Sequence, residues 1–233
     1  MIFDLVANKK PEAIDQVKKQ NYMLSWRSSK NNFTPLLLAA YHGNIEFVRF
    51  FGKLKNLRKY FNLVGLDNMG IYHFAALRNN HEIIRFLLSE SYECTVTCDG
   101  GLLPLHIAAR ECATESLELL CEKTKDINKR TDDDFTALHF AVYNNSIDCV
   151  RVIMKYHPNI NIKDKIKSMT PIDIAESLGY SEIKEVILKM SKECVGSTPL
   201  LSSYTFVPCS PKKSGNSGKA KIITPQQSKK NLM

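Results

Sequence analysis

One short motif recurs five times along the chain at nearly constant spacing. Its copies are TPLLLAA from Thr34, GIYHFAA from Gly70, LPLHIAA from Leu103, TALHFAV from Thr136 and TPIDIAE from Thr170. Successive copies start 36, 33, 33 and 34 residues apart. A period in the low thirties is typical of stacked supersecondary units, and such stacks present an extended surface rather than one buried catalytic pocket. The repeat therefore constrains both the fold and the kind of function.

Each copy predicts the same helix-turn-helix unit. A first short helix begins near the Thr-Pro pair, because threonine suits the capping position and proline suits the first turn. Small residues such as Ala39 let neighbouring helices approach closely, and turn residues such as Gly43 tolerate the left-handed backbone that ends a helix. A second, amphipathic helix follows, with apolar residues such as Phe47 and Phe51 at helical spacing. A polar stretch rich in Asn and Asp closes the unit.

These units resemble the ankyrin repeat, whose signature is T-P-L-H-x-A. The copies LPLHIAA and TALHFAV each differ from its first four positions by one residue. The resemblance covers roughly residues 1–190. It implies an all-α ankyrin-repeat solenoid that binds proteins through its loop tips and the concave face of its first helices.

We expect about six units with a cap at each end. Residues 4–19 predict a degenerate helix pair, and Lys184 stands where the inner copies have apolar residues. Terminal repeats need polar outer faces, so we expect a complete stack. The expected domain spans 1–190, with units near 1–32, 33–68, 69–101, 102–134, 135–168 and 169–190, followed by a tail at 191–233.

The positive charge of the chain lies mostly in that tail. The formal net charge is +8, and residues 191–233 hold seven Lys and one Glu. The repeats therefore carry only about +2. The tail is rich in Lys, Pro, Ser and Gly, a composition that favours disorder. A nucleic-acid partner is expected at most weakly, through the tail.

Targeting features and cysteine usage favour a reducing compartment. No run of 18 apolar residues occurs, so we expect no membrane span. The order of charges at the N-terminus differs from that of a secretory signal. Seven scattered cysteines, an odd number, favour free thiols. We expect a monomer in the cytoplasm, with the nucleus as an alternative.

The sequence predicts neither a metal site nor an enzyme. The resemblance implies that His73, His106 and His139 are structural hydrogen-bonding residues, one in each unit, rather than metal ligands. Cys94 and Cys98 lack a second ligand pair at zinc-like spacing. No nucleophile elbow, phosphate-binding loop or zinc-protease motif is present. We therefore expect no catalytic residues and no cofactor.

The resemblance also indicates which residues would meet a protein partner. These are the residues before each motif, the residues after each alanine pair, and an acidic tip. Aromatic, Met and Arg side chains, which are enriched at interface cores, recur among them. For the residues before each motif, the alternative is packing between the loops of neighbouring units. For the residues after each alanine pair, the alternative is a face that contacts only solvent. The candidates are Phe33, Tyr41, His42, Met69, Leu77, Arg78, Leu102, Arg110, Glu111, Asp132, Asp133, Phe135, Tyr143, Asn144 and Met169.

Charged residues suggest a way to orient such a partner. The longest interval between motif copies, from Thr34 to Gly70, contains Lys53, Lys55, Arg58 and Lys59. The loop before the Thr136 copy contains three aspartates, at 132–134. A basic loop near one end of the stack and an acidic loop further along would orient a dipolar partner. Two solvated turns are the alternative interpretation.

Short motifs in the tail suggest regulation. Ser210 begins an S-P-x-K form read by proline-directed kinases, and phosphate there would remove nearly two positive charges. Residues 208–213 match a motif that is bound by domains recognising left-handed proline helices. Residues 230–233 loosely resemble a cyclin-docking motif. We expect an interaction scaffold or adaptor, with an inhibitor or targeting subunit of an enzyme on another chain, or a nucleic-acid-associated protein, as alternatives.

Overall fold

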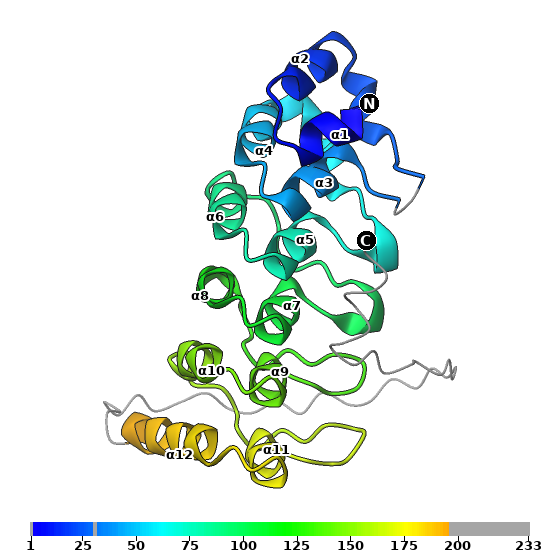
Figure 1. Cartoon of the computed structure of the whole chain (residues 1–233). Helices are drawn as coiled ribbons and strands as arrows, with labels where there is room; N and C mark the ends of the chain where they lie inside the picture. Colours follow the sequence, from blue (N-terminus) through cyan, green and yellow to red (C-terminus); the bar gives the residue numbers. More distant parts are fainter. Residues whose placement is uncertain (1, 30–31, 196–233) are drawn as a thin grey trace, which may run out of the picture.

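The chain folds into a stack of helix pairs. The computed structural model describes residues 2–29 and 32–195. Figure 1 shows two parallel rows of helices, with long loops extending from one side of the stack. We call these loops fingers. The row next to the fingers, the inner row, contains α1 (Ile2–Ala7), α3 (Pro35–His42), α5 (Ile71–Leu77), α7 (Pro104–Arg110), α9 (Ala137–Tyr143) and α11 (Pro171–Ser177). The outer row contains α2 (Glu12–Lys19), α4 (Ile45–Gly52), α6 (His81–Ser89), α8 (Thr114–Lys123), α10 (Ile147–Met154) and α12 (Ser181–Val195).

Short 3-10 helices occupy the connections between pairs. They are η1 (Asn21–Ser25), η2 (Lys55–Asn62), η3 (Leu66–Asn68) and η4 (Asp99–Gly101). Each inner helix contacts the inner helix of the next pair, and α4, α6, α8, α10 and α12 contact one another in the same order. The predicted all-α solenoid of helix-turn-helix units is therefore confirmed within the described residues.

The residues predicted to begin and end the inner helices do so in the structure. The Thr34 hydroxyl accepts a hydrogen bond from the Leu37 amide at 3.3 Å, and Pro35 occupies the first turn of α3. Gly43 ends α3 with a φ of 70°. In the fourth unit a cysteine, Cys112, takes the corresponding left-handed position, with a φ of 56°. The sequence did not reveal this turn, because cysteine is not a usual residue for that backbone.

The core is a continuous line of small apolar cores. The paired alanines of the inner helices are buried, and so are the large side chains that face them. Fully buried large side chains are Phe33, Phe47, Phe51, Phe74, Leu24, Leu36, Leu37, Ile83, Ile84, Leu87, Leu105 and Ile107. Each unit is therefore stabilised by its neighbours, as expected for a solenoid.

Asparagine side chains join successive units at the helix turns. Asn44 caps α4 by accepting from the Phe47 amide at 3.1 Å, and its Nδ2 donates to the Val6 carbonyl at 3.0 Å. Asn80, at the same place in the next unit, donates to the Ala40 carbonyl at 2.7 Å. These bonds satisfy the carbonyls at the ends of the inner helices, which lack partners inside the helix.

We expect Asn44→Ala to lower the free energy of unfolding by about 2 kcal/mol, because it removes a cap and leaves a buried carbonyl without its donor. Urea unfolding followed by circular dichroism measures this change. Asn44→Ser is the matched comparison, because serine keeps a capping oxygen without adding a charge and loses the amide donor to the Val6 carbonyl. A loss below about 0.5 kcal/mol in the alanine variant would show that the bridge between units contributes little.

Two expectations about the chain need correction. The helix α12 continues to Val195, five residues beyond the predicted domain boundary at 190. The basic segment of the long second unit is not a finger tip, because it forms η2 near the end of α4. There Arg58 donates to the Glu90 carbonyl at 2.6 Å and stacks over the Tyr92 ring at 4.4 Å. The remaining tail predictions, Ser210 included, concern residues 196–233, which lie outside the described residues.

Candidate protein-interaction surface

The exposed ends of the inner helices bring several predicted residues together. We call the surface made by these helix ends and the finger tips the inner face. At its N-terminal half, the half-buried Tyr41 ring lies 5.9 Å from Phe33 and 6.4 Å from Phe74. The guanidinium of Arg78 stacks over Tyr41 at 5.1 Å, and His42 packs edge-on against the same ring at 5.1 Å. A rigid aromatic ring with a cation on its face suits a protein interface.

A second aromatic cluster lies in the fifth unit. Phe135 is 5.8 Å from Tyr143 and 5.5 Å from Phe140, and all three rings are half-buried. Asn144 is half-buried beside them and donates from Nδ2 to the Phe140 carbonyl at 3.0 Å. Sequence reasoning missed Phe140, although its place within the TALHFAV copy could have identified it.

Between the two clusters the inner face carries apolar residues and an ion pair. Leu77 and Leu102 are half-buried. Arg110 and Glu111 form an ion pair at 3.2 Å, with side-chain exposures of 20% and 21%. Such a pair adds little stability at a protein surface. It offers a partner one donor and one acceptor group in a partly desolvated setting.

The residues before each motif differ in their burial. Phe33 is only 1% exposed and stacks against Phe74 at 4.4 Å, and Met69 is 9% exposed. Both side chains are enclosed by the core, which favours packing between neighbouring units, the alternative interpretation, for these two candidates. Leu102, Phe135 and Met169 are half-buried and keep part of their surface accessible.

The acidic tip is accessible. Asp132 is exposed and Asp133 is half-buried. The third aspartate, Asp134, is paired with Arg130 at 3.8 Å and Lys165 at 3.6 Å. The finger before it carries the exposed Asp99 and the finger before that Asp67, both of which sequence reasoning missed.

Two of the three recurring histidines, His73 and His106, tie adjacent units together. His73 accepts from the Gly70 amide at 3.1 Å, and its other nitrogen lies 3.1 Å from the Leu102 carbonyl of the next finger. His106 repeats this arrangement with the Leu103 amide at 3.0 Å and the Lys129 carbonyl at 2.9 Å. Burial lowers the pKa of both histidines to about 4, against the opposing effect of those carbonyls.

His139 occupies the third equivalent position. Its Nδ1 accepts from the Thr136 amide at 3.1 Å, and its Nε2 has no hydrogen-bond partner among the described residues. Burial lowers its pKa, while the carbonyls of Met169 and Ile162 oppose the shift. All three histidines are therefore neutral at physiological pH and engaged in packing.

Cys98, Cys121 and Cys149 are buried free thiols, whereas the free thiol of Cys112 is exposed. Burial raises the pKa of Cys98 to about 11 and that of Cys121 to about 12, so both stay protonated at neutral pH. Burial also raises the pKa of Cys94, which lies four residues before Cys98. Among residues 2–29 and 32–195, no group of three or more His, Cys, Asp or Glu side chains could hold a metal ion.

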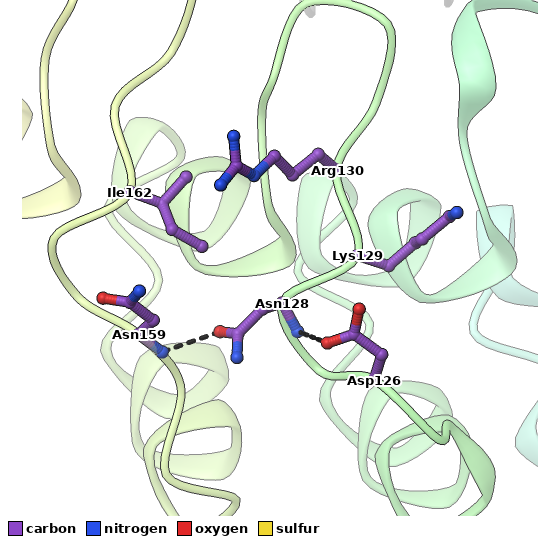
Figure 2. A pocket seen from close by; sticks show the side chains of 6 residues that line it. All are labelled: Asp126, Asn128, Lys129, Arg130, Asn159 and Ile162. Atoms are coloured by element: carbon purple, nitrogen blue, oxygen red, sulfur yellow. Dashed lines mark hydrogen bonds between the residues drawn. The ribbon is translucent and has the colours of Figure 1, made fainter. Parts of the chain in front are cut away.

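Two hollows of the described surface lie beside the stems of the fingers. Figure 2 shows the first, of about 380 Å³, with Arg130 reaching toward Ile162 of the next finger. Asn128 bridges this hollow, since its amide donates to Asp126 at 2.9 Å and its side-chain oxygen accepts from the Asn159 amide at 2.7 Å. A second hollow of about 250 Å³ includes Cys94 in its lining. Neither contains a residue of the predicted partner-binding set.

Comparison with known proteins assigns the family. The model for ankyrin repeats (3 copies) matches residues 4–97, 52–131, 71–166 and 125–198. These matches cover most of the chain, and the chain belongs to the ankyrin repeat family. Among the described residues, none of the helices combines the length and apolar character needed to cross a membrane.

The chain is also similar to several curated proteins. It is 29% identical to a fowlpox virus ankyrin repeat protein over 170 residues, which covers 70% of this chain and 48% of the viral protein. It is 36% identical to alpha-latroinsectotoxin-Lt1a of Latrodectus tredecimguttatus over 102 residues, 43% of this chain and 7% of the toxin. A Saccharomyces cerevisiae protein named as a probable 26S proteasome regulatory subunit, p28, is 29% identical over 139 residues, 55% of this chain and 60% of the yeast protein. The chain therefore spans less than two thirds of each of these relatives.

Proposed function

We propose that this chain is a non-enzymatic scaffold or adaptor that binds another protein through its inner face. The observation that carries the proposal is the pair of aromatic clusters around Tyr41 and Tyr143, whose rings are half-buried and held by their neighbours. A rigid ring loses little conformational entropy on binding, so more of the contact energy remains as affinity. Ankyrin repeats generally mediate protein–protein interaction, which supports the same function.

The proposal predicts that Tyr41→Ala combined with Tyr143→Ala weakens partner binding by about a hundredfold, since buried tyrosines at interfaces are frequent hot spots. The partner is first captured with the full-length chain, and its affinity is then measured by calorimetry. The matched control is Tyr60→Ala with Tyr156→Ala, because these tyrosines are also half-buried but follow the outer helices. Unchanged circular dichroism shows that both variants fold. Equal affinities of the two double variants would refute the proposal.

A second candidate is a regulatory, inhibitory or targeting subunit for an enzyme on another chain. The similarity to the yeast protein named as a proteasome regulatory subunit favours it. A catalytic activity that co-purifies with the chain but is absent from the purified chain would support this role. An inactive partner would support the plain scaffold.

A third candidate is association with nucleic acid. Residues 196–233 hold six Lys and no Asp or Glu, which favours contacts with phosphate groups. Such binding should fall steeply with salt and disappear when 196–233 are deleted. We propose Ser210 as a phosphorylation site within this segment, and mass spectrometry of the protein from cells tests it. The free thiols at Cys98 and Cys121 support a reducing compartment, cytoplasmic or nuclear.

A further inference from the structure

The two edges of the inner face carry opposite charges. Each inner helix begins next to a finger and ends at the turn to its outer helix, so finger tips and helix turns lie at opposite edges. A helix of seven or eight residues is about 11 Å long. This length separates the two edges and leaves the aromatic and apolar residues of the inner face between them.

The edge at the helix turns is basic in the N-terminal units. His42 ends α3 and Arg78 follows α5 at the equivalent place, whereas Lys9 lies one position further into the turn after α1; all three are exposed. Burial lowers the pKa of His42, and the charges of Arg78 and Lys9 lower it further, so the three groups lie near one another. Neither Lys9 nor Arg78 forms an ion pair within the described part of the chain. The nearby Glu115 accepts from Asn79 at 2.6 Å, and Glu111 is paired with Arg110.

The edge at the finger tips is acidic in the second, third and fourth units, one unit further along the stack than the basic edge. Asp67, Asp99 and Asp132 lie in three successive fingers, and all are exposed. The carboxylate of Asp99 accepts from Asn68 of the preceding finger at 2.6 Å. Their carboxylates form no ion pairs with other described residues, whereas Asp134 is neutralised by Arg130 and Lys165. The acidic edge ends at the last finger, which carries the exposed Lys165.

We infer that the partner presents an amphipathic α-helix to the inner face, with an apolar stripe flanked by basic residues on one side and acidic residues on the other. The inference rests on the proposed function and specifies the chemistry of its partner. The apolar stripe covers the half-buried rings and Leu77 and Leu102. The basic flank faces Asp67, Asp99 and Asp132, and the acidic flank faces Lys9 and Arg78.

The spacing of the units matches the pitch of such a helix. Packed helices lie about 8–10 Å apart, and seven residues of an α-helix advance about 10.5 Å. Lysine or arginine repeated every seven residues therefore meets one acidic tip per unit. Because the two edges differ in sign, the flank that carries the basic residues also sets the direction in which the partner helix runs.

A display library tests this inference on the full-length chain. Its members are helices of about 18 residues, long enough to span three units, with a fixed Leu/Phe stripe and Lys or Glu randomised at the flanking positions. We expect enrichment of sequences with Lys on one flank and Glu on the other. A selected peptide should bind about tenfold more tightly than an isomer of the same composition with the charges mixed across both flanks.

Protein variants then assign the charges. Asp67→Asn, Asp99→Asn and Asp132→Asn together should weaken the selected peptide about tenfold. Asparagine keeps the hydrogen-bonding oxygen of Asp99 and tolerates the left-handed backbone of Asp67, whose φ is 52°. The matched control, Asp148→Asn with Glu182→Gln and Glu185→Gln, removes three exposed charges from outer helices and should leave affinity unchanged.

Three results would overturn the inference. They are enrichment of peptides with unsorted charges, equal affinity of the two isomers, and no enrichment. If peptides with unsorted charges bind and lose affinity in the Tyr41→Ala and Tyr143→Ala variant, the charge assignment is wrong and the proposed function stands. If no peptide binds while the captured protein still depends on those tyrosines, the helical partner alone is wrong. If the captured protein is also indifferent to them, the proposed function fails as well.

Discussion

Phe33→Ala should lower the free energy of unfolding by about 3–5 kcal/mol, which is typical when an enclosed phenylalanine is truncated and leaves a cavity. Phe33 is 1% exposed and lies edge-on to Phe74 at 4.4 Å, so its ring joins the second unit to the third. Because each unit of a solenoid contacts only its neighbours, the loss should fall on the N-terminal half. Hydrogen exchange and urea unfolding measure it.

Phe135→Ala is the comparison that isolates burial, since Phe135 occupies the same position in its own unit but is half-buried. We expect it to cost about half as much or less, because less apolar surface is removed from the core. Unchanged stability together with weaker partner binding in Phe33→Ala would instead identify Phe33 as a contact residue.

Stability should also fall as the pH is lowered from 7 to 5. The pKa of His73 and His106 is about 4 in the folded chain, against about 6.5 when unfolded. The unfolded chain therefore binds protons first, and stability, fully present above pH 6.5, is lost between pH 6.5 and 4. The expected loss between pH 7 and pH 5 is on the order of 2 kcal/mol per histidine.

Urea unfolding at several pH values tests this prediction through the slope of stability against pH. His106→Gln should lower the stability at pH 7, because its bonds to Leu103 and Lys129 are lost, and should also make the slope shallower by one proton. In the His73→Gln and His106→Gln double variant, the slope of stability against pH should be shallower by two protons. A slope that is the same in all three proteins would exclude the histidines as the cause.

The fold could be predicted from the sequence because its signals repeat in register. Thr34 and Pro35 begin a helix, Gly43 ends it, and the alanines between them are small enough for close packing. The burial of single side chains could not be predicted in the same way. Phe33 and Phe135 share one register position, yet Phe33 is enclosed and Phe135 is not. That difference depends on neighbours brought together by stacking, such as Phe74 on Phe33.

The charge pattern of the inner face could likewise be predicted from the sequence only in part. The acidic Asp132 and Asp133 were recognisable in the sequence because they stand side by side. Asp67 and Asp99 are single residues in fingers of different composition, and only the stacking of the fingers brings them onto one edge with Asp132. The basic residues of η2 suggested a finger tip, but the extra length of that unit folds against α4 instead.

The most direct test of the account is the footprint of the bound partner on the full-length chain, measured by amide hydrogen exchange. The account predicts added protection in the fingers and the inner helices α3, α5, α7 and α9, with the outer helices α4, α6, α8 and α10 unchanged. Protection confined to the outer helices, or to residues 196–233, would contradict it.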